Sequence, residues 1–339
     1  MSGPTETGLA QRLERLAGAR VSDLRATGSQ FAYRHYRASL ADGRVVFVKA
    51  AAGNQGATLT ASALRAEARG LEWLAEAGTV PVPSVAGCDE STLVISWVPA
   101  GAADAASADR FGRDLALMHA AGADRFGAPW PGFIASLPLP NDGPAAAEDT
   151  AAGEDSAAGE DRAAGEDRAA GEDTAGAGGR GTAGERTGAG AWPGWYASRR
   201  LLPYLRRAAD AGTLGPAHVR PVEAVLARIT ELAGPAEPPS RIHGDCWSGN
   251  VLWSGGRGWL IDPAAHGGHR ETDLAMLALF GAPFLERILA SYDEAAPLAA
   301  GWRARVPLHQ LHPLLVHACL FGAGYAGPVA GAARAALAA

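Results

Sequence analysis

The chain has 339 residues, 47% of them hydrophobic, which is enough for a sizeable core or for two packed lobes. Its formal net charge of −6 comes from residues 145–190, which hold eleven acidic residues and four arginines. The rest of the chain, with 26 basic and 25 acidic residues, is close to neutral, so its charge indicates neither nucleic acid nor an anionic membrane as a partner.

Cysteine usage and the amino terminus point to the cytoplasm. The three cysteines, Cys88, Cys246 and Cys319, are too few for a disulfide framework and fit a reducing compartment. Residues 1–10 lack the basic and apolar regions of a secretory signal, and no stretch is long and apolar enough to cross a membrane. We therefore expect a soluble, cytoplasmic protein, and we expect it to be a monomer.

The first hundred residues are rich in predicted strands. Hydrophobic periodicity predicts a helix over 7–18 and strands over 21–26, 31–40 and 44–50. Between the first two strands lies Thr27-Gly28-Ser29-Gln30, in which Gly28 and Ser29 could let the backbone approach a phosphate. This is a weak match to a glycine-rich phosphate loop.

Lys49 is the only lysine of the chain, and the other 29 of its 30 lysine and arginine residues are arginines. It follows the apolar run Val45-Val46-Phe47-Val48, which predicts a buried strand. Kinases reach the α- and β-phosphates of ATP with a lysine at such a position, where the compact ammonium suits a tight site better than a guanidinium. A helix predicted over 59–77 offers Glu67 as its ion-pair partner.

Helical patterns dominate after a predicted strand over 92–98 and the hinge-like Pro99-Ala100-Gly101. Helices are predicted over 105–120, 195–211, 216–232, 273–280 and most of the chain beyond 283. Strands first and helices after them indicate an α+β, two-lobed molecule. We expect a small β-rich, nucleotide-binding lobe at 1–98 and a larger helical lobe, catalytic and acceptor-binding, at 99–144 and 191–339.

Residues 145–190 separate the two pieces of the second lobe with repeats of Ala-Ala-Gly-Glu-Asp-x. The segment has no aromatic or β-branched apolar residues to bury, so it cannot offset the loss of backbone entropy on ordering, which amounts to roughly 1 to 2 kcal/mol per residue. We expect a disordered insert.

The most informative motif is His243-Gly244-Asp245-Cys246-Trp247-Ser248-Gly249-Asn250, with Asp262 twelve residues further on. Phosphoryl transfer to a hydroxyl needs an acidic group that accepts the hydroxyl proton, and an amide and a second carboxylate that hold magnesium. Asp245, Asn250 and Asp262 supply these groups at the spacing used by kinases, with two short strands predicted at 251–253 and 258–261. The sequence therefore predicts an ATP- and Mg²⁺-dependent kinase.

Several other residues are expected to have structural roles, and for Trp247 two roles stay open. His266 and His269 have no cysteine or acidic partners at zinc spacing, and Asp273 is expected to anchor the catalytic loop from the start of a helix. Trp247 could shape the acceptor pocket or pack in the core. Neither Gly-x-Ser-x-Gly nor Gly-Lys-Ser/Thr occurs, which argues against the usual hydrolase and P-loop classes.

The motif from His243 to Asn250, with Asp262-Pro263-Ala264 and the run from Gly268 to Met276, resembles the fructosamine kinase (ketosamine-3-kinase) family. The similarity covers nearly the whole chain except the insert, and Trp-Ser-Gly-Asn separates this family from the related aminoglycoside and choline kinases. It implies a protein-kinase-like fold and phosphorylation by ATP of the sugar 3-hydroxyl of small-molecule or protein-bound ketosamines. The product is unstable, so the implied role is deglycation repair.

Roles follow from the resemblance position by position. Asp245 is implied to be the base, Asn250 and Asp262 the magnesium ligands, and Lys49 and Glu67 the phosphate pair. The adenine hinge is implied at Ser96, Trp97 and Val98. Near the acceptor we expect His243, Trp247 and His269.

Two departures from the family concern the acceptor. The polar run common in the family is replaced here by an apolar stretch, 132–141, and an aromatic pair by His266-Gly267. The sugar or amine handled can therefore differ from fructosamine. Two alternatives stay open: a kinase of the aminoglycoside or choline type, and a nucleotide-binding pseudokinase, against which the retained catalytic set argues.

Overall fold

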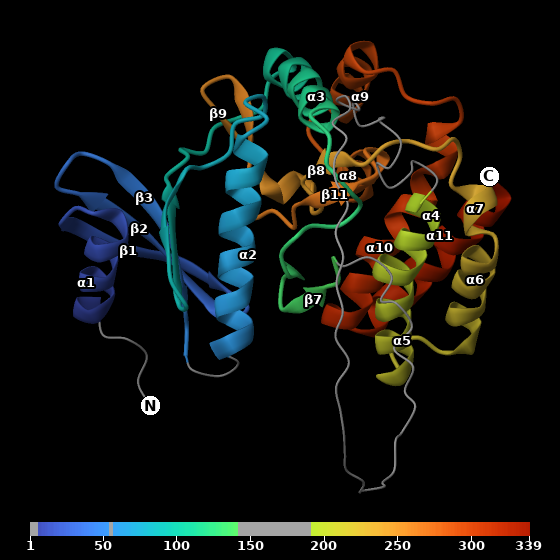
Figure 1. Ribbon diagram of the computed structural model, residues 1–339, viewed down its shortest axis with the longest axis horizontal. Helices are drawn as coiled ribbons and strands as arrows, with labels where there is room; N and C mark the ends of the chain where they lie inside the picture. The colour runs from blue at the N-terminus through green and yellow to red at the C-terminus, as the bar shows by residue number, and fades with distance from the viewer. Residues whose placement is uncertain (1–5, 54–56, 142–190) are drawn as a thin grey trace, which may run out of the picture.

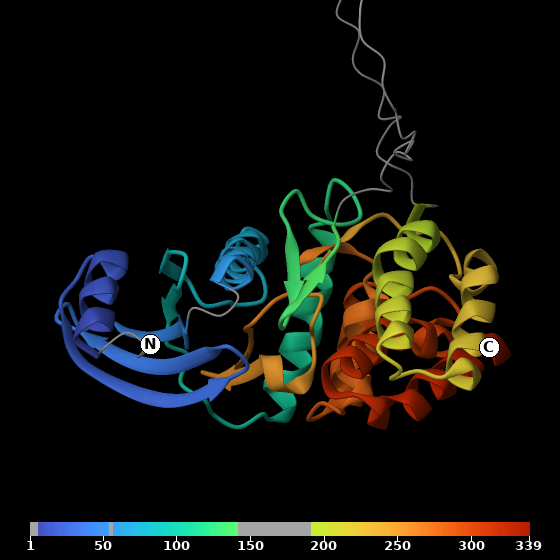
Figure 2. The same cartoon turned by 90° about the horizontal axis from the view of Figure 1, so that it is seen from below.

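The computed structural model describes residues 6–53, 57–141 and 191–339. The expected disorder of 145–190 lies outside these residues. Two parts stand side by side, a sheet with two helices and a mainly helical part (Figure 1). Seen from below, they form an elongated molecule with the sheet at one end (Figure 2). The predicted α+β, two-part architecture is confirmed.

The first part is built on one antiparallel sheet of five strands in the order β1-β2-β3-β5-β4. The strands are β1 (Val21–Gln30), β2 (Tyr33–Leu40), β3 (Val45–Ala51), β4 (Val85–Cys88) and β5 (Thr92–Ser96). Two helices, α1 (Glu6–Ala17) and α2 (Ala57–Ala75), complete this part.

Alternation along β3 decides which side chains face each helix. Val46 and Val48 pack with Leu9 and Leu13 of α1 in one apolar cluster. Phe47 has the opposite parity and packs with the cluster that α2 forms on β5. Lys49 shares the parity of Phe47, so the strand presents its amine on the α2 side.

The second part begins with α3 (Ala105–Ala120), whose Asp104 and Ser107 form a reciprocal cap at its start. The elements that follow are the hairpin β6 (Gly132–Ile134) and β7 (Leu137–Leu139); α4 (Trp192–Tyr196), a π-helical turn (Ala197–Leu201), α5 (Leu202–Asp210), α6 (Pro216–Ala227) and α7 (Ile229–Leu232); β8 (Ser240–Ile242), β9 (Val251–Ser254), β10 (Arg257–Leu260) and β11 (His266–Gly268); and α8 (Glu271–Leu279), α9 (Leu285–Ala295), α10 (Trp302–Phe321) and α11 (Ala326–Ala338). None of the described helices is long and apolar enough to cross a membrane.

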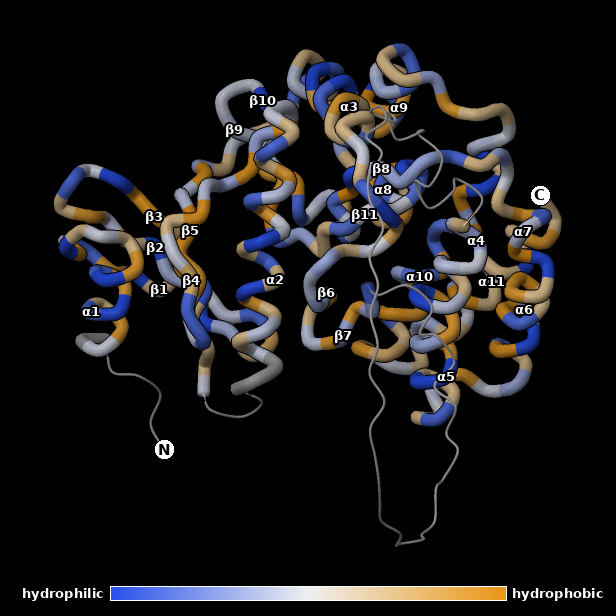
Figure 3. The backbone as a smooth tube through the Cα atoms, in the orientation of Figure 1, coloured by the Kyte–Doolittle hydropathy of each residue, from blue (hydrophilic) through white to orange (hydrophobic). Residues whose placement is uncertain are grey.

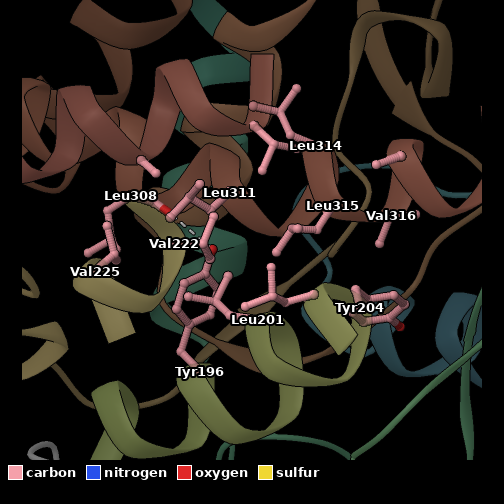
Figure 4. Close-up of a cluster of buried hydrophobic side chains, with 14 of the residues drawn as sticks. Tyr196, Leu201, Tyr204, Val222, Val225, Leu308, Leu311, Leu314, Leu315 and Val316 are labelled. Carbon is pink, nitrogen blue, oxygen red and sulfur yellow. Dashed lines mark hydrogen bonds between the residues drawn. The ribbon is translucent and has the colours of Figure 1, made fainter. Parts of the chain in front are cut away.

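The largest core of this part lies around α10. Leucines of α10 pack against Tyr196, Leu201 and Tyr204, and Val222 and Val225 of α6 close the cluster (Figure 4). Along α2 and α6, hydrophilic and hydrophobic stretches alternate, as expected of helices with one buried face (Figure 3). This packing fixes α10 as one wall of the cavity described next.

Candidate active site

A cavity of about 450 Å³ lies where the sheet, α2, α8 and α10 meet, and it contains the predicted catalytic set. Its lining includes four formally charged side chains, those of Lys49, Glu67, Asp245 and Asp262. Trp247 and Asn250 also line it. Residues more than 200 positions apart in the sequence therefore share one cavity.

Lys49 holds two carboxylates at once. Its Nζ donates hydrogen bonds of 2.6 Å to Glu67 Oε2 and of 2.6 Å to Asp262 Oδ1. Burial alone would lower the pKa of Lys49, but Asp262 and Glu67 raise it above its ordinary value, so the amine is charged. Burial raises the pKa of Glu67 to about 7, and Lys49 offsets only part of this effect.

Backbone strain is concentrated at the cavity. Four non-glycine residues among those described have a left-handed φ, and three of them line it: Phe31 (+50°), Ala135 (+50°) and Asp262 (+54°). Such conformations persist only where the surroundings enforce them, and they are common at functional sites. At Asp262, the turn follows β10 directly and brings the carboxylate to Lys49.

Asp245 and Asn250 are joined within the loop that follows β8. Asn250 Nδ2 donates to the backbone carbonyl of Asp245 at 2.9 Å and to its Oδ2 at 3.0 Å. Removal from bulk water raises the pKa of Asp245 to about 7, and the charge of Asp262 acts in the same direction. A carboxyl group with this pKa is suited to accept a proton near neutral pH.

Asp273, at the start of α8, anchors the catalytic loop as expected. Its Oδ2 accepts from the backbone N–H of His243 at 2.7 Å, and its Oδ1 accepts from that of Gly244 at 2.9 Å. His119 of α3 lies 3.1 Å from Oδ2, and its other ring nitrogen lies 2.8 Å from Tyr292 Oη of α9. Three helices thus hold the loop through one buried carboxylate.

Trp247 lies folded over its own loop. A Cβ at Gly249 would come within 2.2 Å of the indole, so only glycine leaves room for the ring. Trp247 is partly exposed to the cavity and contacts Phe280 edge to face, with centroids 5.9 Å apart. Of the two roles left open for Trp247, its position favours the acceptor pocket.

His243 and His269 do not line the cavity. His243 is fully buried; its Nδ1 accepts from the Asp245 N–H at 3.3 Å, and its Nε2 lies 2.9 Å from the Ile261 carbonyl oxygen. His269 is also buried, against the rings of Trp192 and His309. Backbone groups occupy one imidazole and core packing encloses the other, so neither side chain faces the cavity in which substrate contact was expected.

The expected nucleotide loop and hinge lie outside the lining of this cavity. In place of Gly28 and Ser29, which lie within β1, the lining includes Gln30, the last residue of β1, and Phe31 of the β1–β2 turn. At the hinge, the N–H groups of Ser96 and Trp97 are bonded to the carbonyls of Ser84 and Val45. Val98 is buried next to them.

Sequence reasoning missed Tyr33 and His35, which line the cavity from β2. His35 pairs with Lys49 across the β2–β3 ladder, and Lys49 Nζ lies 5.6 Å from the Tyr33 ring centroid. The signal was their spacing of two residues, which places both on one face of a strand. The register that brings that face to Lys49 could not be read from the sequence.

A second group of possible metal ligands, His269, Glu271 and His309, lies buried away from the cavity. Both Glu271 oxygens accept from Arg305, at 2.9 and 2.5 Å. A guanidinium therefore already neutralises the carboxylate that a cation would need, and the group acts as an ion-pair network between α8 and α10.

Comparisons with known proteins agree with this geometry. A family model described as "Fructosamine kinase" matches residues 17–145 and 184–338. A "probable ketoamine kinase" of Thermus thermophilus is 32% identical over 264 residues, or 78% of each chain. The solved structure of a candidate fructosamine-3-kinase from Thermobifida fusca YX-ER1 is 46% identical with a TM-score of 0.81, covering 99% of this chain and all of that one. A choline/ethanolamine kinase family protein of Mesorhizobium loti, 15% identical with a TM-score of 0.55 over 98% of this chain and 94% of its own, shares the fold.

Proposed function

Because this chain belongs to the fructosamine kinase family, we propose that it transfers the γ-phosphoryl group of ATP to the 3-hydroxyl of a ketosamine, with Asp245 as the base. The observation that carries the proposal is the convergence of Asp245, Asn250, Asp262 and Lys49 on one cavity. In the reaction, the bond from the γ-phosphorus to the β,γ-bridging oxygen breaks and a bond to the sugar oxygen forms. The hydroxyl proton passes to Asp245.

The residues around Asp245 bind the phosphates and orient the base. Lys49 is charged and reaches the phosphates from the sheet, while Glu67 holds its amine in place. Asn250 orients the Asp245 carboxylate through its amide N–H, which leaves its amide oxygen free of that contact. These contacts preorganise the base before substrate binds.

Magnesium fits the oxygen donors that this site offers. The Asp262 side chain is 44% exposed, although one of its oxygens is bonded to Lys49, and the Asn250 amide oxygen is a second hard ligand. Magnesium in kinases takes one or two protein ligands, with the rest from phosphate and water. When bound, the ion would neutralise charge on the β- and γ-phosphates.

We also propose that the protein acts in the cytoplasm and as a monomer. A cytoplasmic, reducing compartment is supported by three free cysteines, of which Cys246, next to the base, is fully buried. Action as a monomer is supported by the fact that one chain supplies every group named above.

The test is an ATP-consumption screen over ribulosamines, fructosamines, an aminoglycoside and choline, run with wild type and Asp245→Asn. We expect ketosamines to be preferred, and kcat to fall about 100- to 10,000-fold in the variant, the usual contribution of a general base. ATP binding should persist in the variant, because Lys49 and Asp262 are untouched.

The matched control is Asp109→Asn, which loses only a surface ion pair with Arg287. Unchanged turnover of Asp245→Asn would refute the role of the base. Preference for choline or the aminoglycoside would refute the acceptor class.

A further inference from the structure

Exposed apolar side chains gather at the cavity. Among the described residues, five large apolar side chains are exposed: Phe31, Leu117, Phe280, Phe284 and Phe321. Phe31, Phe280 and Phe321 line the active-site cavity, with 52%, 41% and 53% of their surfaces exposed. Exposed apolar surface gathered in a concave site indicates a ligand that covers it.

These phenylalanines belong to one continuous row of rings. From Trp247 in the catalytic loop, the row passes to Phe280 at 5.9 Å, then to His317 at 5.2 Å and Phe321 at 5.3 Å, measured between ring centroids. Phe321 meets Phe31 of the β1–β2 turn at 6.3 Å. Tyr325 packs beside the row, 5.0 Å from His317. We call these six residues the ring row.

The ring row carries no formal charge. Burial lowers the pKa of His317, so its imidazole is neutral at pH 7. Apolar residues of the second part also line the cavity: Phe133, Ile134 and Ala135 from the β6–β7 hairpin, and Met276, Pro313, Val316 and Leu320 from α8 and α10. Gln30, next to Phe31, is polar but uncharged. Among the described residues that line the cavity, the only carboxylates and the only lysine or arginine are the catalytic and phosphate-binding candidates Lys49, Glu67, Asp245 and Asp262.

Resting on the proposed function, we propose that the ring row binds the amine-borne group of the ketosamine and selects an uncharged aromatic or alkyl group there. Trp247 joins the row to the catalytic loop, so a sugar whose hydroxyl reaches Asp245 places its amine substituent among these rings. The protonated secondary amine is accommodated by ring faces. A carboxylate on the substituent would lose water without gaining a cationic partner.

The experiment compares three ketosamines that share one sugar and differ in the amine: benzylamine, methylamine and glycine. We expect kcat/KM for the benzylamine adduct to exceed that for the methylamine adduct about tenfold or more, because a phenyl group is buried. The glycine adduct should be the poorest of the three. Phe321→Ala should reduce the benzylamine-to-methylamine ratio about tenfold.

A second variant tests the charge argument in the opposite direction. Phe321→Arg places a cation in the row and should raise kcat/KM for the glycine adduct relative to the methylamine adduct. Leu117→Ala is the matched control, because Leu117 is 54% exposed but lies outside the cavity, and it should leave all ratios unchanged.

The outcomes separate this inference from the proposed function. Equal kcat/KM for the three adducts, or ratios that Phe321→Ala and Phe321→Arg do not change, would overturn the inference while leaving the kinase activity in place. Absence of turnover with every adduct would overturn the proposed function and the inference with it.

Discussion

At the scale of single residues, Lys49 explains why one lysine persists in a chain that otherwise uses arginine. Its Nζ lies 2.6 Å from a Glu67 oxygen and 2.6 Å from an Asp262 oxygen, and the side chain is only 10% exposed. A point charge on a flexible stem fits between two carboxylates, whereas a planar guanidinium needs a wider space. Replacing Lys49 by arginine therefore changes the size and shape of the cation while its charge stays the same.

We expect Lys49→Arg to lower kcat/KM for ATP at least about tenfold, equivalent to about 1.4 kcal/mol of transition-state stabilisation. Steady-state kinetics with varied ATP measures this effect. Arg287→Lys serves as the reciprocal control, because Arg287 pairs with Asp109 at the surface and does not line the cavity. ATP kinetics of Lys49→Arg equal to wild type would contradict the role assigned to the ammonium.

At the scale of elements, α8 links the catalytic loop to the helical core. Asp273, in its first turn, is fully buried and accepts two backbone N–H groups of that loop. His119 extends the contact to α3, and Tyr292 extends it to α9. The loop is therefore positioned by helix packing as well as by its own turns.

Asp273→Asn should lower the free energy of unfolding by about 3 kcal/mol. The amide NH₂ group of asparagine would replace a carboxylate oxygen that now accepts a hydrogen bond from a buried backbone N–H. Urea denaturation measures the loss. Tyr292→Phe removes the outer hydrogen bond of the network and leaves the contacts of Asp273 in place, so its loss of stability should be about 1 kcal/mol. A loss for Asp273→Asn no larger than that for Tyr292→Phe would contradict the anchoring role.

Elements with a strong local pattern could be predicted from the sequence. The apolar run of β3, the leucine spacing of α2 and the limits of α3 lie where the periodicity placed them. The missed strands β4, β6, β7, β8 and β11 have only three or four residues each. β8 pairs with β11, 24 positions later in the chain, and no local pattern records such a pairing.

In the candidate site, too, some residues could be predicted from the sequence and others could not. Asp245, Asn250 and Asp262 follow a motif whose spacing carries the chemistry, so these residues could be named in advance. The ring row could not, since Phe31, Phe280 and Phe321 come from three segments that meet only when α10 packs beside the sheet. His269 lies close to the motif in the sequence, yet its side chain turns into the core.

At the scale of the whole molecule, acid stability depends on the ion pair between α8 and α10. Burial alone would raise the pKa of Glu271, but its contacts with His309 and Arg305 lower it to about 2. A depressed pKa in the folded state adds stability above the ordinary value of 4.5, and this contribution is lost as the pH falls toward 2.

Glu271→Gln should therefore be destabilised by about 3 kcal/mol at pH 7, where Arg305 loses its buried partner. The difference from wild type should shrink as the pH falls from 4.5 toward 2, because protonated Glu271 resembles glutamine. Urea midpoints of both proteins across this range measure it. A difference that stays constant with pH would contradict the ionised pair.

The solitary lysine has a chemical consequence for an enzyme that acts on sugar–amine adducts. Reducing sugars condense with amines that are uncharged and accessible, whereas the Lys49 amine is protonated, buried and enclosed by two acids. Arginine occupies every other lysine-or-arginine position. The enzyme thus presents almost no lysine on which the lesion it processes could form.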